Sequence, residues 1–146
     1  MGLRLPQDRT IALDTMVFIY HFEAHPLFSP VTTKIFEQIE TGKTKAVTSY
    51  ITLLEILVKP FKEGNRRAVS DYTELLCTFP NLEFVPIGKE IAKVAASIRA
   101  RYSIKTPDAI QIATAIVSDT ALYITNDDTL KKISEVRIML LKDMLS

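Results

Sequence analysis

Four carboxylates occupy positions where an open sheet of parallel strands would bring them together. Asp14 ends the apolar run TIALD and Asp127 ends the run ALYITND, and both runs have the character of short buried strands. Glu55 lies in the apolar helical stretch ITLLEILVKPF, and Asp108 lies in the first turn of a further helix, TPDAIQIATAIVS. Because ligands bind beyond the carboxyl ends of parallel strands, we expect the four side chains to face one cavity there.

Asp14, Glu55 and Asp108 have no basic residue among their immediate neighbours in sequence. The segments ALDTM, TLLEI and TPDAI contain no lysine or arginine, and like charges held close together do not all stay ionised without a cation. Oxygen ligands without a companion histidine or cysteine suit Mg²⁺ or Mn²⁺ better than Zn²⁺. A metal site of this kind serves the hydrolysis of phosphodiester bonds. We therefore predict that Glu55 is buried and that a metal ion is its partner.

Each acid also has a simpler interpretation when it is taken alone. Asp108 complements a helix dipole, and Asp14 and Asp127 are typical of turn formers that follow strands. Glu55 could lie on a narrow solvated stripe of its helix. The placement of all four at one edge of the same predicted sheet favours a functional site.

Short apolar runs alternate with helical patterns along the chain. The predicted strands are residues 10–14, 45–49, 82–87, 121–127 and 136–141, and the predicted helices are residues 31–42, 51–61, 66–79, 88–102 and 106–118. This alternation indicates a parallel sheet with helices on both faces. The predicted fold class is therefore α/β, a three-layer α/β/α sandwich around a central, mostly parallel sheet of four to five strands. We expect a single domain over residues 1–146.

Local signals indicate where two of the helices begin. Ser49 is the expected N-cap of the helix at 51–61, and Pro60 is expected to end or kink that helix. Thr106 is the expected N-cap of the helix at 106–118, with Pro107 at its first helical position.

The composition excludes several classes of protein. The 146 residues carry 18 basic and 17 acidic side chains, and the net charge of +1 argues against a protein that coats a polyanion. Cys77 is the single cysteine, which excludes an internal disulfide and favours the cytosol. No apolar run approaches the ~18 residues that a membrane helix needs. We expect a soluble, cytoplasmic protein without a membrane partner.

The acidic segments resemble the motifs of the PIN-domain ribonucleases, and within them the VapC-type toxins of toxin–antitoxin pairs. IALDTMVFIY is similar to the opening strand and turn, TSYITLLEIL to the second motif, TPDAIQIATAI to the third and LYITNDDTLKKI to the fourth. The match covers nearly the whole chain in the family's order. It makes Asp14, Glu55, Asp108 and Asp127 the metal-binding and catalytic acids, with Thr125 as a candidate helper.

The resemblance implies a PIN-like fold and an endonuclease that uses Mg²⁺ or Mn²⁺ to cleave RNA, leaving a 5′-phosphate and a 3′-hydroxyl. It also implies a homodimer and a small antitoxin that blocks the acidic site. The chain has Met16 where the family usually has a polar residue two places after the first acid, which alters hydrogen bonding beside the metal. Asp128 is a second acid next to Asp127 and a further candidate helper, although the spacing after Thr125 favours Asp127.

Basic residues that precede Asp108 are the candidate contacts for RNA. Arg99, Arg101 and Lys105 lead directly into the acidic site, where a phosphate must be held against carboxylate repulsion. The simpler interpretation of these residues is a solvated face.

Other chemistries receive less support. His21 and His25 have a spacing used by zinc ligands, but no third ligand is evident, and Cys77 is expected in the core. A phosphatase of the haloacid dehalogenase type needs a second acid where Met16 stands. Two alternatives stay open: a PIN-like nuclease that processes RNA without being a toxin, and a catalytically decayed PIN fold kept for binding or dimerisation.

Overall fold

The structure, a computed structural model, describes residues 4–145, so the limits of the predicted domain at residues 1 and 146 lie outside the described part. The strands are β1 (Thr10–Leu13), β2 (Lys45–Ser49), β3 (Leu82–Val85), β4 (Tyr123–Thr125) and β5 (Ile138–Leu140). The helices are α1 (Thr15–Phe22), α2 (Ser29–Glu40), α3 (Tyr50–Lys62), α4 (Arg66–Cys77), α5 (Lys89–Tyr102) and α6 (Thr106–Val117), with the short 3₁₀ helices η1 (Asp128–Lys132) and η2 (Leu141–Met144).

The strands form one parallel sheet with the order β3-β2-β1-β4-β5. In the centre, Ala12 of β1 pairs with Val47 of β2 on one side and with Tyr123 of β4 on the other. Pairing is parallel at the outer strands as well. The predicted parallel sheet of four to five strands is therefore confirmed.

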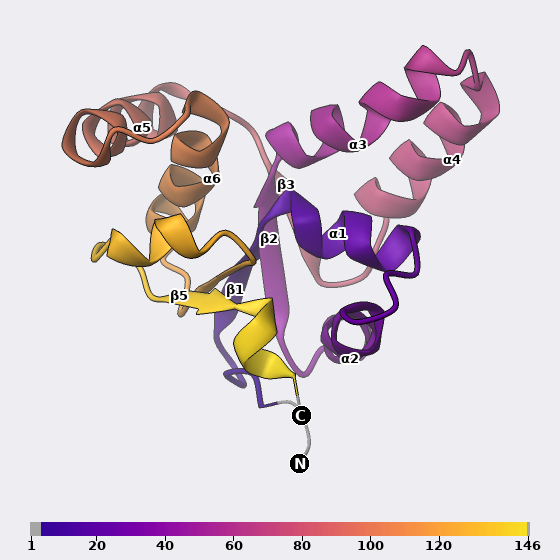
Figure 1. The fold of residues 1–146 in the computed structure, drawn as a ribbon, viewed down its shortest axis with the longest axis horizontal. Helices are drawn as coiled ribbons and strands as arrows, with labels where there is room; N and C mark the ends of the chain where they lie inside the picture. Colours follow the sequence, from indigo (N-terminus) through magenta and orange to yellow (C-terminus); the bar gives the residue numbers. More distant parts are fainter. Residues whose placement is uncertain (1–3, 146) are drawn as a thin grey trace.

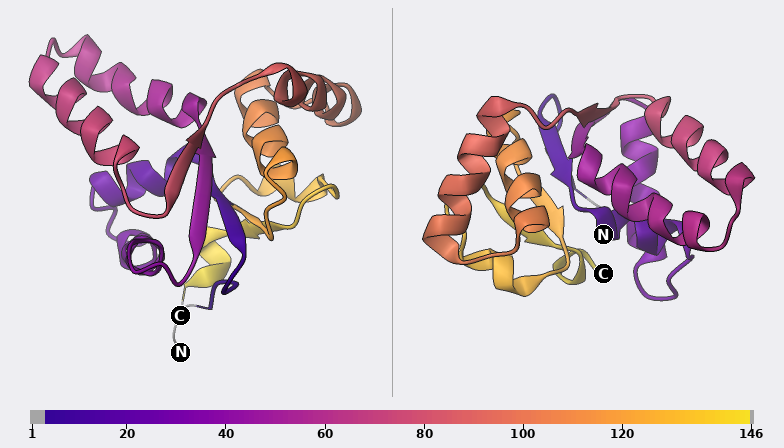
Figure 2. Two further views of the ribbon diagram at one scale, coloured as in Figure 1. Left: turned by 180° about the vertical axis from the view of Figure 1, so that it is seen from behind. Right: turned by 90° about the horizontal axis from the view of Figure 1, so that it is seen from above.

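Helices cover both faces of the sheet, as the views in Figures 1 and 2 show. Leu13 and Ile124 belong to the apolar cluster that α1, α2, α3 and α4 form on one face. Their strand neighbours Ala12 and Tyr123 point the opposite way and belong to the cluster formed with α5 and α6. This division confirms the predicted α/β/α sandwich.

Four of the five strands, all except β2, end earlier than the sequence predicts, and at β1 and β4 this leaves an acid outside the sheet. β1 ends at Leu13 and β4 ends at Thr125, whereas the predicted strands included Asp14 and Asp127. Each of these acids is instead the N-cap of the helix that follows, and its carboxylate accepts a hydrogen bond from a backbone amide of that helix. Both acids still lie just beyond the carboxyl edge of the sheet.

Helix boundaries confirm one predicted cap and correct another. Ser49 caps α3 by accepting a hydrogen bond from the backbone amide two residues on. α6 has Lys105 as its N-cap, so the prediction for Thr106 was wrong. The Thr106 hydroxyl instead accepts a hydrogen bond from Arg99 Nη1 at 3.0 Å. Pro60 does not end α3, which continues for two more residues.

None of the helices within residues 4–145 combines the length and the apolar character of a membrane-spanning segment.

Candidate functional site

The acidic residues lie where the order of the strands reverses. From β1 the chain adds β2 and β3 on one side, and it later returns to add β4 and β5 on the other. In sheets of this kind the crevice outside the carboxyl ends of the two strands at the reversal binds ligands. Asp14 follows β1 and Asp127 follows β4, and the backbone amide of Asp14 donates to the carbonyl of Ile124 at 2.9 Å.

Asp14 is the buried centre of the site, with only 9% of its surface exposed. Its Oδ1 accepts a hydrogen bond from the backbone amide of Thr15 at 2.7 Å, and its Oδ2 accepts one from Thr125 Oγ1 at 2.7 Å. Burial raises the pKa of the Asp14 carboxyl, these two hydrogen bonds oppose that rise, and the charge of Glu55 adds to it. The two hydrogen bonds therefore fix the orientation of the carboxylate, and burial makes its ionised form unfavourable.

Asp108 lies in the first turn of α6 and is half-buried. Burial raises the pKa of its carboxyl, and the negative charges of Asp14 and Asp127 raise it further. Lys105 acts in the opposite direction and lowers the pKa of this group. Three acids from separate parts of the chain therefore repel one another at one edge of the sheet.

Glu55 is exposed, so the prediction that it is buried was wrong. The side of α3 that carries it is open to solvent, as the 59% exposure of Leu54 and the 43% exposure of Val58 show. A hydroxyl group positions the acid: Thr15 Oγ1 donates a hydrogen bond to Glu55 Oε1 at 2.6 Å. Glu55 thus lies beside the residue that follows Asp14, on the solvent side of the site.

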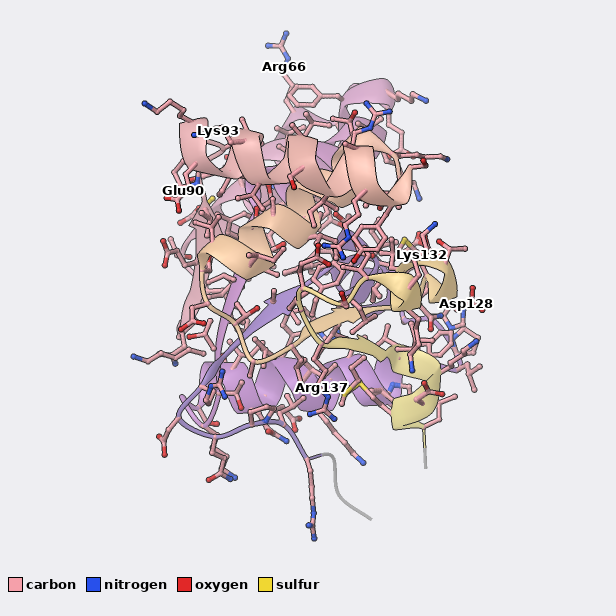
Figure 3. All side chains as sticks on the ribbon, turned by 90° about the vertical axis from the view of Figure 1, so that its left-hand side faces the viewer. Arg66, Glu90, Lys93, Asp128, Lys132 and Arg137 are labelled. Carbon is pink, nitrogen blue, oxygen red and sulfur yellow. The ribbon has the colours of Figure 1, made fainter. Side chains whose placement is uncertain are left out.

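The two adjacent acids after β4 point to different partners. Asp127 is exposed, and its Oδ1 accepts hydrogen bonds from the amide and the hydroxyl of Thr129. Asp128 forms an ion pair with Lys142 at 3.2 Å and projects from the outer surface in Figure 3. The charge of Asp127 raises the pKa of Asp108, which places Asp127 nearer to the acidic cluster than Asp128.

Tyr123 is a member of the site that the sequence did not reveal. Its side chain is fully buried on β4, and its hydroxyl has no hydrogen-bond partner within residues 4–145. Burial raises the pKa of this phenol well above its ordinary value, and the charges of Asp14 and Asp108 raise it further. The hydroxyl is near enough to lower the pKa of Asp14 but not in hydrogen-bonding geometry with it. A signal was available, since Tyr123 shares a strand face with Thr125.

Gln111 and a group of threonines form a second set that was missed. Gln111 is buried on α6, and its side chain reaches the hydroxyls of Thr15 and Thr52. The signal in the sequence is an amide on the otherwise apolar helix TPDAIQIATAIVS.

The candidate RNA contacts differ in how freely they can bind a phosphate. Arg99 joins α5 to α6, because it donates to the carbonyl of Ile104 and to the hydroxyl of Thr106, each at 3.0 Å. Arg101 forms an ion pair with Glu135 at 3.1 Å. Lys105 is exposed and acts electrostatically on the acid of α6, so it is the basic residue most directly linked to the site.

The side chains fit a hydrated divalent metal. Within residues 4–145, no three histidine, cysteine, aspartate or glutamate side chains are arranged to hold a metal ion directly. Mg²⁺ keeps several of its waters and is usually bound through one or two carboxylates, a requirement that Asp14 and Asp108 meet. The unbonded Tyr123 hydroxyl is a buried polar atom that a water of such an ion would satisfy.

The two histidines do not form a metal pair. His25 lies beyond the end of α1, and its Nδ1 accepts hydrogen bonds from the backbone amides of Leu27 and Phe28. His21 contacts the hydroxyl of Thr32 at 3.3 Å. Cys77 is exposed, so its predicted place in the core was wrong, because it lies on the solvent side of α4.

Fold and site together define an α/β/α protein with an acidic centre at the switch point of a parallel sheet. The family model described as the PIN domain matches residues 11–136. The chain therefore belongs to the PIN domain family, a family of nucleases that act on nucleic acids. The resemblance inferred from the four acidic segments is confirmed.

Solved structures with the same fold come from bacterial complexes. VapBC2 from Rickettsia felis, bound to a DNA fragment from its promoter, matches with a TM-score of 0.72 at 16% identity over 90% of this chain and 98% of the other. DNA-bound VapBC from Salmonella typhimurium matches with a TM-score of 0.70 at 18% identity, and VapBC-1 from nontypeable Haemophilus influenzae with 0.66 at 19%, each over 91% of this chain and 98% of the other. At these identities the likeness establishes the fold alone. No curated protein matches the chain in sequence.

Proposed function

We propose that the protein is a Mg²⁺- or Mn²⁺-dependent endoribonuclease that hydrolyses phosphodiester bonds of RNA. The observation that carries this proposal is the buried Asp14 carboxylate, which lies among other acids. None of the ion pairs within residues 4–145 involves Asp14. A buried carboxyl without an ion-pair partner is kept ionised more easily when a cation from solution binds it. Membership of the PIN domain family supplies the class of reaction.

Asp14, Asp108 and Glu55 are the residues that would hold the metal, with Asp127 at the exposed rim. A bound metal would supply Lewis acidity for the phosphate and a more acidic water. Asp14 is suited to the role because both of its oxygens are already held in place, one of them by the predicted helper Thr125. Asp128, the other candidate helper, forms an ion pair with Lys142 and is not included among the proposed metal-binding residues.

Lys105 is the proposed contact for the RNA phosphate next to the scissile bond. Its positive charge already acts on Asp108, so it would offset the repulsion between an incoming phosphate and that acid. Arg99 and Arg101 would contribute less, because their guanidinium groups already bind neighbouring protein groups.

We propose further that the protein is the toxin of a toxin–antitoxin pair, as the likeness to VapBC proteins suggests. A groove of about 450 Å³ between α1, α3 and α4 borders Glu55. Its lining includes the apolar side chains of Ile19, Phe22 and Tyr72, and its three acids, Glu23, Glu55 and Glu63, outnumber its one base, Lys59. These glutamates would repel RNA and attract a segment with basic and apolar side chains. Such a segment of an antitoxin would cover Glu55 and block the site.

The homodimer that the family resemblance implies stays a prediction. Light scattering on the purified chain would give its mass in solution.

The proposed activity is tested by incubating RNA with Mn²⁺ or Mg²⁺ and purified protein. Wild type should cleave internally, EDTA should stop cleavage, and Asp14→Asn should be inactive although folded. Asp128→Asn is the matched control, because it removes an acid three residues after Thr125 that forms its ion pair with Lys142, away from the site. Cleavage that persists in EDTA or in Asp14→Asn would exclude this site as its source.

Growth arrest on expression, lost in Asp14→Asn, would separate a toxin from an RNA-processing enzyme.

The second candidate is a decayed PIN fold that binds a partner without cleaving RNA. It is favoured by Met16, a half-buried apolar residue at the usual polar position, and by the lack of three ligating acids within residues 4–145. A decayed site should bind no Mn²⁺, whereas the proposed nuclease should gain thermal stability from it.

A further inference from the structure

A buried amide joins α6 to the beginnings of α1 and α3 behind the acidic site. Gln111 is 3% exposed, and its Nε2 donates to Thr15 Oγ1 at 3.1 Å and to Thr52 Oγ1 at 2.8 Å. Its Oε1 accepts from the backbone amide of Ser49 at 3.4 Å, which fixes the orientation of the amide. All the hydrogens of this amide are therefore used.

The first branch from Gln111 ends on an acid of the site. A carboxylate only accepts hydrogen bonds, so Thr15 Oγ1 must give its single hydrogen to Glu55 Oε1, 2.6 Å away. The Thr15 oxygen in turn accepts from Gln111. Hydrogen bonds are thus donated from Gln111 to Thr15 and from Thr15 to Glu55.

The second branch from Gln111 ends on the backbone. Thr48 Oγ1 gives its hydrogen to the carbonyl of Leu13 at 2.8 Å, so Thr52 must be the donor in its 2.7 Å contact with Thr48. The 3.1 Å contact between Thr15 and Thr52 then has no hydrogen left to share. This branch reaches β1 without touching an acid.

We propose that Gln111 is a positioning residue that holds the Glu55 carboxylate in place through Thr15; this rests on the proposed function, in which Glu55 belongs to the metal site. An exposed glutamate side chain otherwise moves among several rotamers. Donation from Gln111 polarises the Thr15 hydroxyl and strengthens its bond to the carboxylate. Groups that orient metal ligands in this way affect metal affinity without touching the ion.

The two branches separate positioning from ordinary packing. Cutting either branch leaves buried polar groups unsatisfied and lowers stability. Cutting the first branch alone releases Glu55, so only that cut should weaken metal binding.

The test measures the Kd for Mn²⁺ by electron paramagnetic resonance on the full chain, with melting in EDTA as the check on folding. Gln111→Met, which cuts both branches, and Thr15→Val, which cuts the first branch alone, should each raise the Kd about tenfold or more, as Glu55→Gln should. Thr15→Ser keeps the hydroxyl and should bind like wild type. Thr52→Val, which cuts the second branch, should melt earlier but bind Mn²⁺ like wild type. Gln111→Met added to Glu55→Gln should cause no further loss.

Three results would overturn the proposal. Wild-type affinity in Gln111→Met and Thr15→Val, with weak binding in Glu55→Gln, would do so and leave the proposed function intact. Equal losses in Thr52→Val would show a general loosening instead. If Gln111→Met does not fold, the pair Thr15→Val and Thr15→Ser decides. If wild type binds no Mn²⁺, the proposed function fails. The positioning role is then tested by the crystal structure of Thr15→Val, and it is overturned if the Glu55 side chain has the same conformation there as in wild type.

Discussion

The acidic site has an inner and an outer half that are built differently. The inner half consists of Asp14, which is buried, and Asp108, which is half-buried, and burial raises the pKa of both carboxyls. The outer half, Glu55 and Asp127, is exposed, and threonine hydroxyls hold these acids in place. The fold therefore concentrates the electrostatic cost in the inner half, where a cation would relieve most of it.

This difference indicates which acids matter most to a bound ion. An inner acid gains a partner for a desolvated charge, whereas an outer acid already has solvent and a hydroxyl. We expect the loss of an inner acid to reduce metal binding and cleavage more than the loss of an outer one.

The largest expected effect is that of Asp14→Asn compared with Glu55→Gln. Cleavage of RNA should fall by about a hundredfold or more in Asp14→Asn, because the ion loses its most buried ligand. Glu55→Gln should cost about tenfold, as expected of a group that tunes the ion from the solvent side. Single-turnover cleavage rates with saturating Mn²⁺ would measure both. Equal losses in the two variants would break the distinction between inner and outer acids.

A smaller effect concerns the pH dependence of stability without metal. The folded pKa of Asp14 is raised above 3.8, so its contribution to stability is present at low pH and is lost as the pH rises through the folded pKa. Asp14→Asn should therefore become progressively more stable relative to wild type as the pH is raised from about 4 towards 7. Urea unfolding in EDTA across this range would show it. A difference that stays constant with pH would mean that Asp14 carries no such cost.

The smallest effect should come from Tyr123→Phe, which removes the unbonded hydroxyl beside Asp14. Metal-free stability should change by no more than about 1 kcal/mol, because no hydrogen bond is lost. The rise in melting temperature on adding Mn²⁺ should be smaller than in wild type, since the hydroxyl would no longer bind a water of the ion.

Tyr50→Phe is the matched control for this change, because Tyr50 is an exposed tyrosine. An identical Mn²⁺ response in Tyr123→Phe and wild type would exclude the hydroxyl from the site.

The sheet was predictable because buried parallel strands are short apolar runs with distinct ends. β2 coincides with the predicted run at Lys45–Ser49. The ends of β1 and β4 were less predictable, because a carboxylate that caps the next helix decides where each strand stops. The strand propensities of the individual residues do not indicate which residue will cap the next helix and so end the strand.

Burial on helices was harder to predict than their existence. Glu55 was expected to be buried because its neighbours are apolar, yet Leu54 beside it is also exposed. Which side of α3 is covered depends on where α1 and α4 pack, and this is set by distant parts of the chain. Cys77 was misplaced for the same reason.

Polar residues inside the fold were the least predictable part of the site. Gln111 and Thr52 look unremarkable in sequence, and their hydrogen bonds join residues 59 apart. A polar amide on an apolar helix, like an acid there, needs a hydrogen-bond partner if it is buried. This is the signal that could have indicated Gln111.

Anomalous diffraction from crystals soaked in Mn²⁺ tests the central claim most directly. The account predicts a peak beside Asp14 and Asp108, with Glu55 on its solvent side, and no such peak in crystals of Asp14→Asn. A peak only at the outer acids, or no peak at the carboxyl edge when Mn²⁺ is saturating, would contradict it.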